Sequence, residues 1–263
     1  MPAHTDPAFA AANETHIYIN TITVSDVVDA LSEGASDFWR HPSHYLFVAL
    51  IYPAVGIVIA VWSAGAVTFP LLYPLAIGFA LVGPIAVIGL YELSRRREDG
   101  EDDNPRYALD IIHHPAIGSM VVIGAFLAIL FAFWIAAAGA LYSFYFAPQP
   151  AEHLSALLRD IFTTPHGWSL LMWGNLVGVG FALVVLATTS IAFPLLVDKG
   201  GSPGRAIGAS LRAFAANPVP LLAWGLFVIA LLVVGSLPLF VGLAIVLPIL
   251  GHATWHLYRK IAD

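Results

Sequence analysis

Residues 117–145 read IGSMVVIGAFLAILFAFWIAAAGALYSFY, a run without a single Asp, Glu, Lys or Arg. A helix needs about 20 largely apolar residues to cross a bilayer, so this stretch predicts a membrane-spanning helix. The whole chain has the same character, since 59% of its residues are hydrophobic and only 11% are charged. Soluble domains carry about a quarter charged residues. The sequence therefore predicts an integral membrane protein.

The remaining composition excludes several classes of function. No cysteine occurs among the 263 residues, which excludes disulfides, thiolate metal sites and thiol nucleophiles. The net charge of −6 argues against nucleic acid as a partner, because little basic surface is left to bind phosphates. We predict the lipid bilayer as the main partner and no cofactor.

The predicted fold class is all-α, a polytopic membrane protein with six transmembrane helices. We expect a cytoplasmic arm with an amphipathic helix over residues 1–40 and a six-helix membrane domain over residues 41–263. The last two helices come from one apolar block that Gly235, Ser236 and Pro238 divide into a hairpin. The predicted spans are 45–66, 69–91, 117–145, 168–197, 219–235 and 238–256.

A short amphipathic segment that stops before a proline leads into four of these spans. The residue before a proline disfavours the α conformation, whereas proline itself is tolerated in the first turn of a helix. We therefore expect short interface helices before helices one, three, four and five. The prolines concerned are Pro42, Pro115, Pro165 and Pro218.

The first of these segments, which leads into helix one, carries an apolar stripe at helical spacing. Ser25 is its expected N-cap, because a serine side chain can accept a hydrogen bond from the first turn. The stripe consists of Val24, Val28, Leu31, Ala35 and Phe38.

The distribution of Lys and Arg predicts the orientation. With six spans, both termini and ten of the 11 basic residues fall on one side, and Arg159 alone falls on the other. Positive residues remain in the cytoplasm. We expect both termini to be cytoplasmic, in a bacterial inner membrane.

Residues 74–96 align without a gap on residues 238–260, a shift of 164 positions. We interpret this match as an internal duplication of a helical hairpin, with helices two and six packed near a pseudo-twofold axis. Glu92 would then be equivalent to His256, and the two side chains would lie close enough to pair. Such repeats are frequent in transporters and are also compatible with a scaffold. The matched residues include Pro74 with Pro238, Gly78 with Gly242, Pro84 with Pro248 and Arg95 with Arg259.

Two segments carry a resemblance to a known family. The stretch from Gly78 to Pro84 running into Gly89–Arg97, together with Gly251–Arg259, resembles the bacterial predicted integral membrane proteins called domain of unknown function 2189. The resemblance extends from about Phe38 onward and implies a membrane location and little else. Some relatives carry a cytochrome c oxidase label, which this sequence does not support as a catalytic assignment. Its mid-membrane segments contain no histidine.

His252 and His256 are the weak candidates for metal ligands. They lie four residues apart on one predicted helix, so both imidazoles can face the same way and hold a metal or one haem edge. The alternative is an ordinary interfacial belt with Trp255 and Arg259, which would tolerate the loss of both rings.

In addition to His256, two further polar residues are functional candidates. Glu92 lies near membrane depth, where an ionisable group is a functional hypothesis by default; the alternative is a local ion pair with Arg95 or Arg96. Asn175 lies well inside a span, as a substrate-facing side chain or as a hydrogen-bonding contact between helices.

Three classes of function remain. The favoured one is a non-catalytic scaffold, assembly factor or accessory subunit of a membrane complex, a respiratory complex included, or a homo-oligomer. The first alternative is a small-solute transporter or channel, favoured by the duplication. The weaker alternative is a metal or haem membrane enzyme at His252 and His256.

Overall fold

The structure is a computed structural model, and it describes residues 17–40, 56, 71, 74–75, 87–146, 154–238 and 242–262. Every named element within these residues is a helix, which confirms the all-α class. The predicted spans 45–66 and 69–91 lie almost wholly outside the described residues. The count of six spans therefore stays a prediction.

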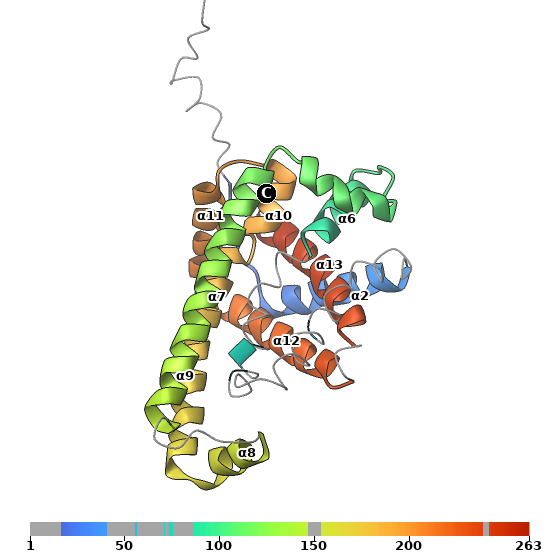
Figure 1. The fold of residues 1–263 in the computed structure, drawn as a ribbon. Coiled ribbons are helices and arrows are strands. Elements are labelled where there is room, and N and C mark those ends of the chain that lie inside the picture. Colours follow the sequence, from blue (N-terminus) through green and yellow to red (C-terminus); the bar gives the residue numbers. More distant parts are fainter. Residues whose placement is uncertain are drawn as a thin grey trace, which may run out of the picture.

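Two long helices form one arm of the molecule (Figure 1). Helix α7, Ile117–Phe146, confirms a helix over the uncharged run, and α9, Pro165–Thr189, packs along it. Their contact includes the rings of Trp134 and Phe181, whose centroids lie 5.6 Å apart. A Cβ atom on Gly178 would lie 2.9 Å from the Trp134 ring, so glycine permits this close approach.

Large apolar side chains point outward from the long helices. Among the described residues, three stretches are long and apolar enough to cross a membrane: Ile117–Phe146, Pro165–Lys199 and Pro218–Ser236. In each stretch, at most 33% of the most apolar 18-residue segment is buried inside the protein. Exposed apolar surface on this scale requires a lipid environment. The exposed side chains include Val122, Phe133, Met172, Leu176, Leu226 and Ile229.

The predicted span 168–197 is not one continuous helix. Helix α9 ends at Thr189, and a separate helix, α10, covers Ala192–Lys199. The break has a local cause, because Pro194 has no N–H to donate to the carbonyl of Ser190, four residues earlier. Ser210 satisfies one backbone N–H at the break, since its Oγ accepts a hydrogen bond from Ile191 N at 3.2 Å and lies 3.0 Å from Ser190 Oγ.

The predicted C-terminal hairpin is present, with one helix displaced. Helix α12, Pro218–Ser236, covers the predicted stretch 219–235, but α13 covers Leu243–Ile261 instead of 238–256. Leu237 and Gly242 lie outside the two helices, and the backbones meet so closely here that a Cβ on Gly242 would lie 2.7 Å from the Gly235 carbonyl oxygen. Glycine at position 242 therefore permits this close approach. Its match in the predicted duplication, Gly78, lies outside the described residues.

Helix α2, Val24–Arg40, packs against α13 (Figure 1). Its N-cap is Thr23 and not Ser25, because Thr23 and Asp26 bond reciprocally as a capping box, with Thr23 N donating to Asp26 Oδ2 at 2.7 Å. The predicted stripe is partly wrong: Phe38 is buried, but Val24 and Val28 are exposed. The buried residues of α2 are Val27, Ala30, Gly34 and Phe38.

Three more short helices occupy the predicted places before prolines or spans. They are η2, Pro105–His113; α8, Leu154–Thr163; and α11, Pro203–Ala216. Helix α8 meets α9 at a tight corner, where a Cβ on Gly167 would lie 2.3 Å from the Asp160 carbonyl oxygen. Their location in the membrane interface stays a prediction.

The two ends of the described chain lie side by side. Ile19 forms a β-bridge with Ala262, and Asn20 N donates to the Ile261 carbonyl at 2.8 Å. Asn217, at the junction of α11 and α12, binds the same N-terminal segment: its Oδ1 accepts from Ile22 N at 2.7 Å, and its Nδ2 donates to Asn20 O at 2.9 Å.

The contact between α2 and α13 gives a test of the packing. A Cβ on Gly34 would lie 2.5 Å from Ala253 N of α13, so Gly34→Ala should separate the two helices and lower the thermal unfolding temperature in detergent. An alanine in a helix is otherwise more stable than glycine by about 0.5–1 kcal/mol. Gly204→Ala, in α11 with nothing within 4 Å of the added atom, is the matched control and should unfold no earlier than the wild type. Equal stability of the two variants would contradict this packing.

Candidate functional site: the polar face of helix α13

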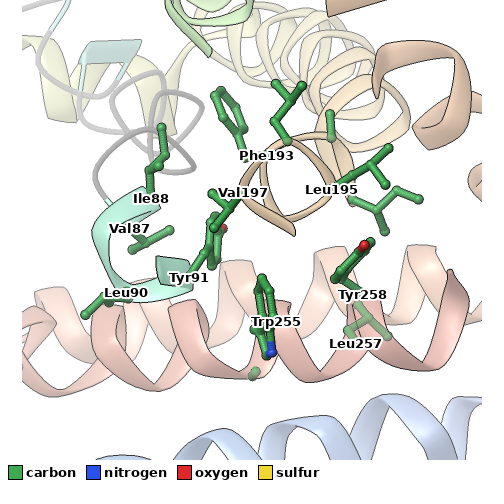
Figure 2. Close-up of a cluster of buried hydrophobic side chains, with 14 of the residues drawn as sticks. Val87, Ile88, Leu90, Tyr91, Phe193, Leu195, Val197, Trp255, Leu257 and Tyr258 are labelled. Carbon is green, nitrogen blue, oxygen red and sulfur yellow. The ribbon is translucent and has the colours of Figure 1, made fainter. Parts of the chain in front are cut away.

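Helix α13 lies between α2, α6 and α10, and its last ten residues carry most of its polar side chains. Helix α6 covers Ile88–Glu98. Gly251 permits the approach of α6, because a Cβ there would lie 2.7 Å from Leu90 Cδ1. Figure 2 shows the apolar layer that results, with Tyr91, Phe193 and Trp255 contributed by α6, α10 and α13.

His252 is a core residue. Its side chain is fully buried, and its Nδ1 lies 2.6 Å from Ser94 Oγ of α6. The expectation of an interfacial belt residue is therefore wrong for His252. A buried imidazole needs a hydrogen-bonding partner, and Ser94 supplies one.

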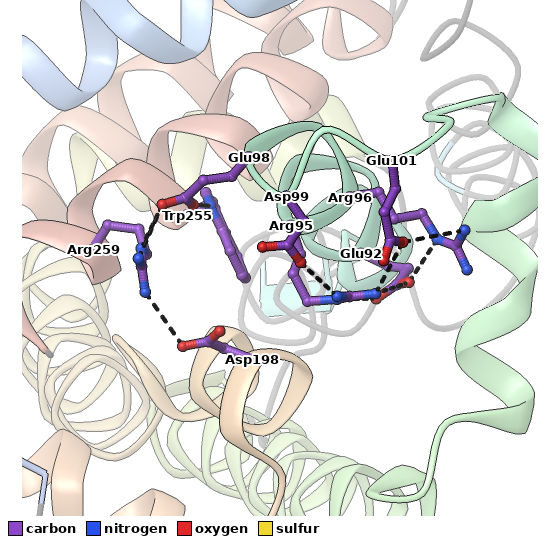
Figure 3. Close-up of polar contacts among 9 residues, drawn as sticks. All are labelled: Glu92, Arg95, Arg96, Glu98, Asp99, Glu101, Asp198, Trp255 and Arg259. Carbon is purple, nitrogen blue, oxygen red and sulfur yellow. Dashed lines mark hydrogen bonds and ion pairs between the residues drawn. The ribbon is translucent and has the colours of Figure 1, made fainter.

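A second set of contacts joins α13 to α6 and α10 (Figure 3). Glu98 accepts a hydrogen bond from Trp255 Nε1 at 3.0 Å and forms an ion pair with Arg259 at 2.9 Å. Arg259 also lies 3.4 Å from Asp198 of α10, which accepts a hydrogen bond from the Tyr258 hydroxyl. Burial and the hydrogen bond to Asp198 raise the pKa of Tyr258, so the phenol stays protonated at neutral pH.

His256 faces α2. Its Nε2 lies 2.9 Å from Asp37 Oδ2, and its Nδ1 lies 3.4 Å from Glu33 Oε2. Lys260 binds Glu33 at 3.1 Å, and Arg97 of α6 lies 3.3 Å from Asp37. Burial alone would raise the pKa of Asp37, but the hydrogen bond with His256 and the neighbouring cationic groups hold it below its usual range.

These contacts define the α13 polar cluster, which consists of six α13 side chains and their partners on α2, α6 and α10. The α13 members are His252, Trp255, His256, Tyr258, Arg259 and Lys260. The partners are Glu33, Asp37, Ser94, Glu98 and Asp198.

His252 binds Ser94 and His256 binds Asp37, so these contacts do not bring the two imidazoles to one shared ligand position. In the described part of the chain, no group of three or more His, Asp or Glu side chains is arranged to hold a metal ion. Their role as metal ligands stays a prediction. The arrangement in this structure suits hydrogen bonds and ion pairs between helices.

Glu92 binds the arginines of its own helix (Figure 3). Its Oε1 lies 2.8 Å from both Arg95 Nη2 and Arg96 Nε, and the carboxylate is buried. The expected pair between Glu92 and His256 is therefore wrong, and the alternative of a local ion pair is confirmed. Burial alone would raise the pKa of Glu92, but hydrogen bonds and charge from the two arginines lower it.

The arginines extend this network beyond Glu92. Arg95 also pairs with Asp99 at 2.8 Å, and Arg96 lies 3.4 Å from Asp110 and 4.2 Å from the centre of the Tyr107 ring. The two contacts of Arg96 attach η2 to α6.

Asn175 lies on α9, remote from this cluster in sequence and on an exposed face. Its Nδ2 donates to the Leu171 carbonyl of the same helix at 2.7 Å. The structure places it as an exposed amide within a candidate span.

Sequence reasoning missed Ser94, Glu98, Asp198 and Asn217. Their partners are 60 to 197 residues away in the chain, and helical spacing does not reveal such contacts. A usable signal existed only for Asn217, which directly precedes the proline that begins α12.

Residues 72–198 match the family model of domain of unknown function 2189 (DUF2189), described as a predicted integral membrane protein. This match confirms the resemblance drawn from the sequence. It is narrower than the expected stretch from about Phe38 onward, and it does not include Gly251–Arg259. No curated protein and no solved structure matches the chain. The family description and the exposed apolar helices agree that this is an integral membrane protein.

The buried pair of Ser94 and His252 gives a direct test of the cluster. His252→Ala leaves the Ser94 hydroxyl without this partner in the protein interior, at a cost of about 1–3 kcal/mol. We expect this variant to unfold well below the wild type in detergent. His256→Ala, which removes a half-buried ring, should lose less stability than His252→Ala. A His252→Ala variant as stable as the wild type would contradict the structural role of the pair.

The lowered pKa of Glu92 predicts a pH dependence. A carboxylate whose pKa falls on folding contributes stability above its unfolded pKa of about 4.3, and loses it as the pH falls through the folded value. Glu92→Gln should therefore be less stable than the wild type at pH 7, and the difference should shrink on acidification. Thermal unfolding in detergent between pH 3 and 7 measures this. Glu101→Gln, at a more exposed side chain, is the control, and a pH-independent deficit in Glu92→Gln would contradict the prediction.

Proposed function

We propose that this protein is a non-catalytic membrane scaffold, an assembly factor or accessory subunit of a larger complex in a bacterial inner membrane. The observation that carries the proposal is the set of contacts that its ionisable candidate residues make within the protein. His252 and His256 bind side chains of α6 and α2, and Glu92 binds the arginines of its own helix, of which Arg96 contacts η2. These contacts connect segments of the same chain, which favours a stabilising role for the three groups.

The proposed orientation places both termini in the cytoplasm. Ile19 pairs with Ala262, so the two ends of the described chain lie together. Arg259 brings the segments around Glu98 and Asp198 to the same end of the molecule. These segments contain most of the basic residues. Helix α8, which carries Arg159, lies at the opposite end of the α7 and α9 pair (Figure 1). The positive-inside rule then assigns the first end to the cytoplasm.

A partner would find exposed apolar side chains on η2. Leu109 is 67% exposed and Ile112 is 61% exposed, on a short helix outside the candidate spans. Helix η2 is fixed to α6 by Arg96 and Asp110, so its outer face is presented by a rigid support.

A transporter is the second candidate, and the break between α9 and α10 favours it. Helices broken within a span line solute sites in many transporters. Here the break gathers buried hydroxyl groups of Thr189, Ser190 and Ser210. These hydroxyls bond within the protein in this conformation, so the scaffold remains the preferred function.

The weaker alternative, a metal or haem enzyme, rests on His252 and His256 alone. Their contacts with Ser94 and Asp37 do not require a metal. Metal analysis and an absorption spectrum of the purified protein test this alternative. Stoichiometric zinc, copper or haem that is lost in His256→Ala would favour it over the scaffold.

The scaffold proposal predicts a stoichiometric protein partner. We expect the wild type, extracted in mild detergent, to migrate in a larger complex on a native gel, and Leu109→Glu with Ile112→Glu to release it while the fold is retained. His113→Gln, an exposed change on the same helix, is the matched control. Saturable uptake of a solute by proteoliposomes containing the purified chain alone would instead support the transporter.

A further inference from the structure

Residues 17–22, which precede α2, form an extended segment whose first side chains alternate between the protein and its surface. Ile17 and Ile19 pack against the core, whereas Tyr18 between them is 72% exposed. Ile22 also packs against the core. This alternation is that of a β-strand with one face buried. We call residues 17–22 the strap.

The Asn217 side chain binds the strap as the backbone of a neighbouring strand would. Its Oδ1 accepts a hydrogen bond from Ile22 N at 2.7 Å, and its Nδ2 donates to the Asn20 carbonyl at 2.9 Å. These two backbone groups flank Thr21, and a residue opposite Thr21 in a parallel ladder would bind the same pair. The amide is buried, with Asn217 only 2% exposed, so its hydrogen bonds matter to its stability.

The C-terminal end of α13 binds the strap beside Asn217. Asn20 N donates to the Ile261 carbonyl at 2.8 Å, and Ile19 forms an antiparallel bridge with Ala262. We call these three residues, Asn217, Ile261 and Ala262, the strap slot. Their hydrogen bonds go to main-chain atoms of the strap, so the same bonds would hold another extended segment. Main-chain bonds of this kind give affinity in strand addition, and the alternate side chains give specificity.

The contacts that fix α2 are separate from those of the strap. The helix has its own N-cap, because Thr23 and Asp26 bond to each other. It is attached to α13 by the contact of Asp37 with His256 and by the close approach at Gly34. Departure of the strap leaves these contacts in place, so the slot can open while α2 stays folded and docked.

We propose that the strap slot is a binding site for an extended aliphatic segment of a partner protein, which adds to the slot in place of the strap. The inference rests on the proposed function, because it states how a partner of the scaffold is bound. Departure of the strap takes two hydrogen bonds from the buried Asn217 amide, and an extended chain restores both. The strap of a second copy is a poorer occupant, because it leads directly into an α2 that is packed on its own α13.

A labelled peptide with the sequence of residues 17–23, IYINTIT, is the probe. The receptor is the full chain with Asn20→Pro and Ile22→Pro, which removes the two strap N–H groups that bind the slot. We expect fluorescence anisotropy in detergent to show saturable binding to this receptor, about tenfold or more tighter than to the wild type, whose own strap occupies the slot. Equal binding to the two chains, or binding to neither, would overturn the inference.

Proline substitutions in the peptide supply the matched control without any change in the protein. Proline in place of Thr21 leaves both bonded N–H groups intact, and this peptide should still bind. Proline in place of both Asn20 and Ile22 should abolish binding. Equal binding of the two peptides would mean that aliphatic side chains adsorb without the slot, and would contradict the inference.

The stability and size of the receptor complete the test. Its thermal unfolding temperature should stay close to that of the wild type, because α2 keeps its own contacts; a receptor that fails to fold would make the strap part of the core and overturn the inference. A wild-type dimer that the two prolines dissociate would instead assign the slot to the strap of a second copy. The native-gel complex of the wild type is measured independently, so failure of peptide binding and failure of the scaffold proposal are distinguishable.

Discussion

The burial of α13 is the constraint on which the rest of the described structure depends. Its C-terminal half carries histidines, a tryptophan, a tyrosine and two basic residues, and a buried polar group without a partner is costly. Helices α2, α6 and α10 supply those partners through Asp37, Ser94, Glu98 and Asp198. The position of α13 therefore determines where three other helices lie.

The two ends of the described structure suit two different environments, one apolar and one polar. The arm of α7 and α9 exposes large apolar side chains, as lipid requires. At the other end, ion pairs such as Arg95 with Glu92 and Arg97 with Asp103 connect short helices. Hydrocarbon would not tolerate that many charges, so they mark an end of the molecule beyond the membrane core. The scaffold proposal follows from this division, because the polar groups stabilise the fold and the apolar faces meet lipid or a partner.

The sequence predicted the local features well. The uncharged run at 117–145 became α7, and prolines marked the starts of α9 and α12, because both signals act within one or two helical turns. Prediction from the sequence failed where contacts between segments distant in the chain determine which side chains are buried or paired. Val24 and Val28 have the spacing of a buried face, yet the close approach of Gly34 to α13 turns a different face inward. The partners of His252 and His256 were unpredictable for the same reason. The duplication stays a prediction, although contacts from Leu90 to Gly251 and from Glu98 to Arg259 show that α6 and α13 run in the same direction.

Hydrogen exchange of the protein in lipid nanodiscs tests the central role of α13 most directly. Glu98→Ala removes the shared partner of Trp255 and Arg259. If α13 holds its neighbours in place, amide protection should fall together in α6, α10 and α13, while α7 and α9 keep theirs. Loss of protection in α6 alone, with α10 and α13 unchanged, would contradict the account.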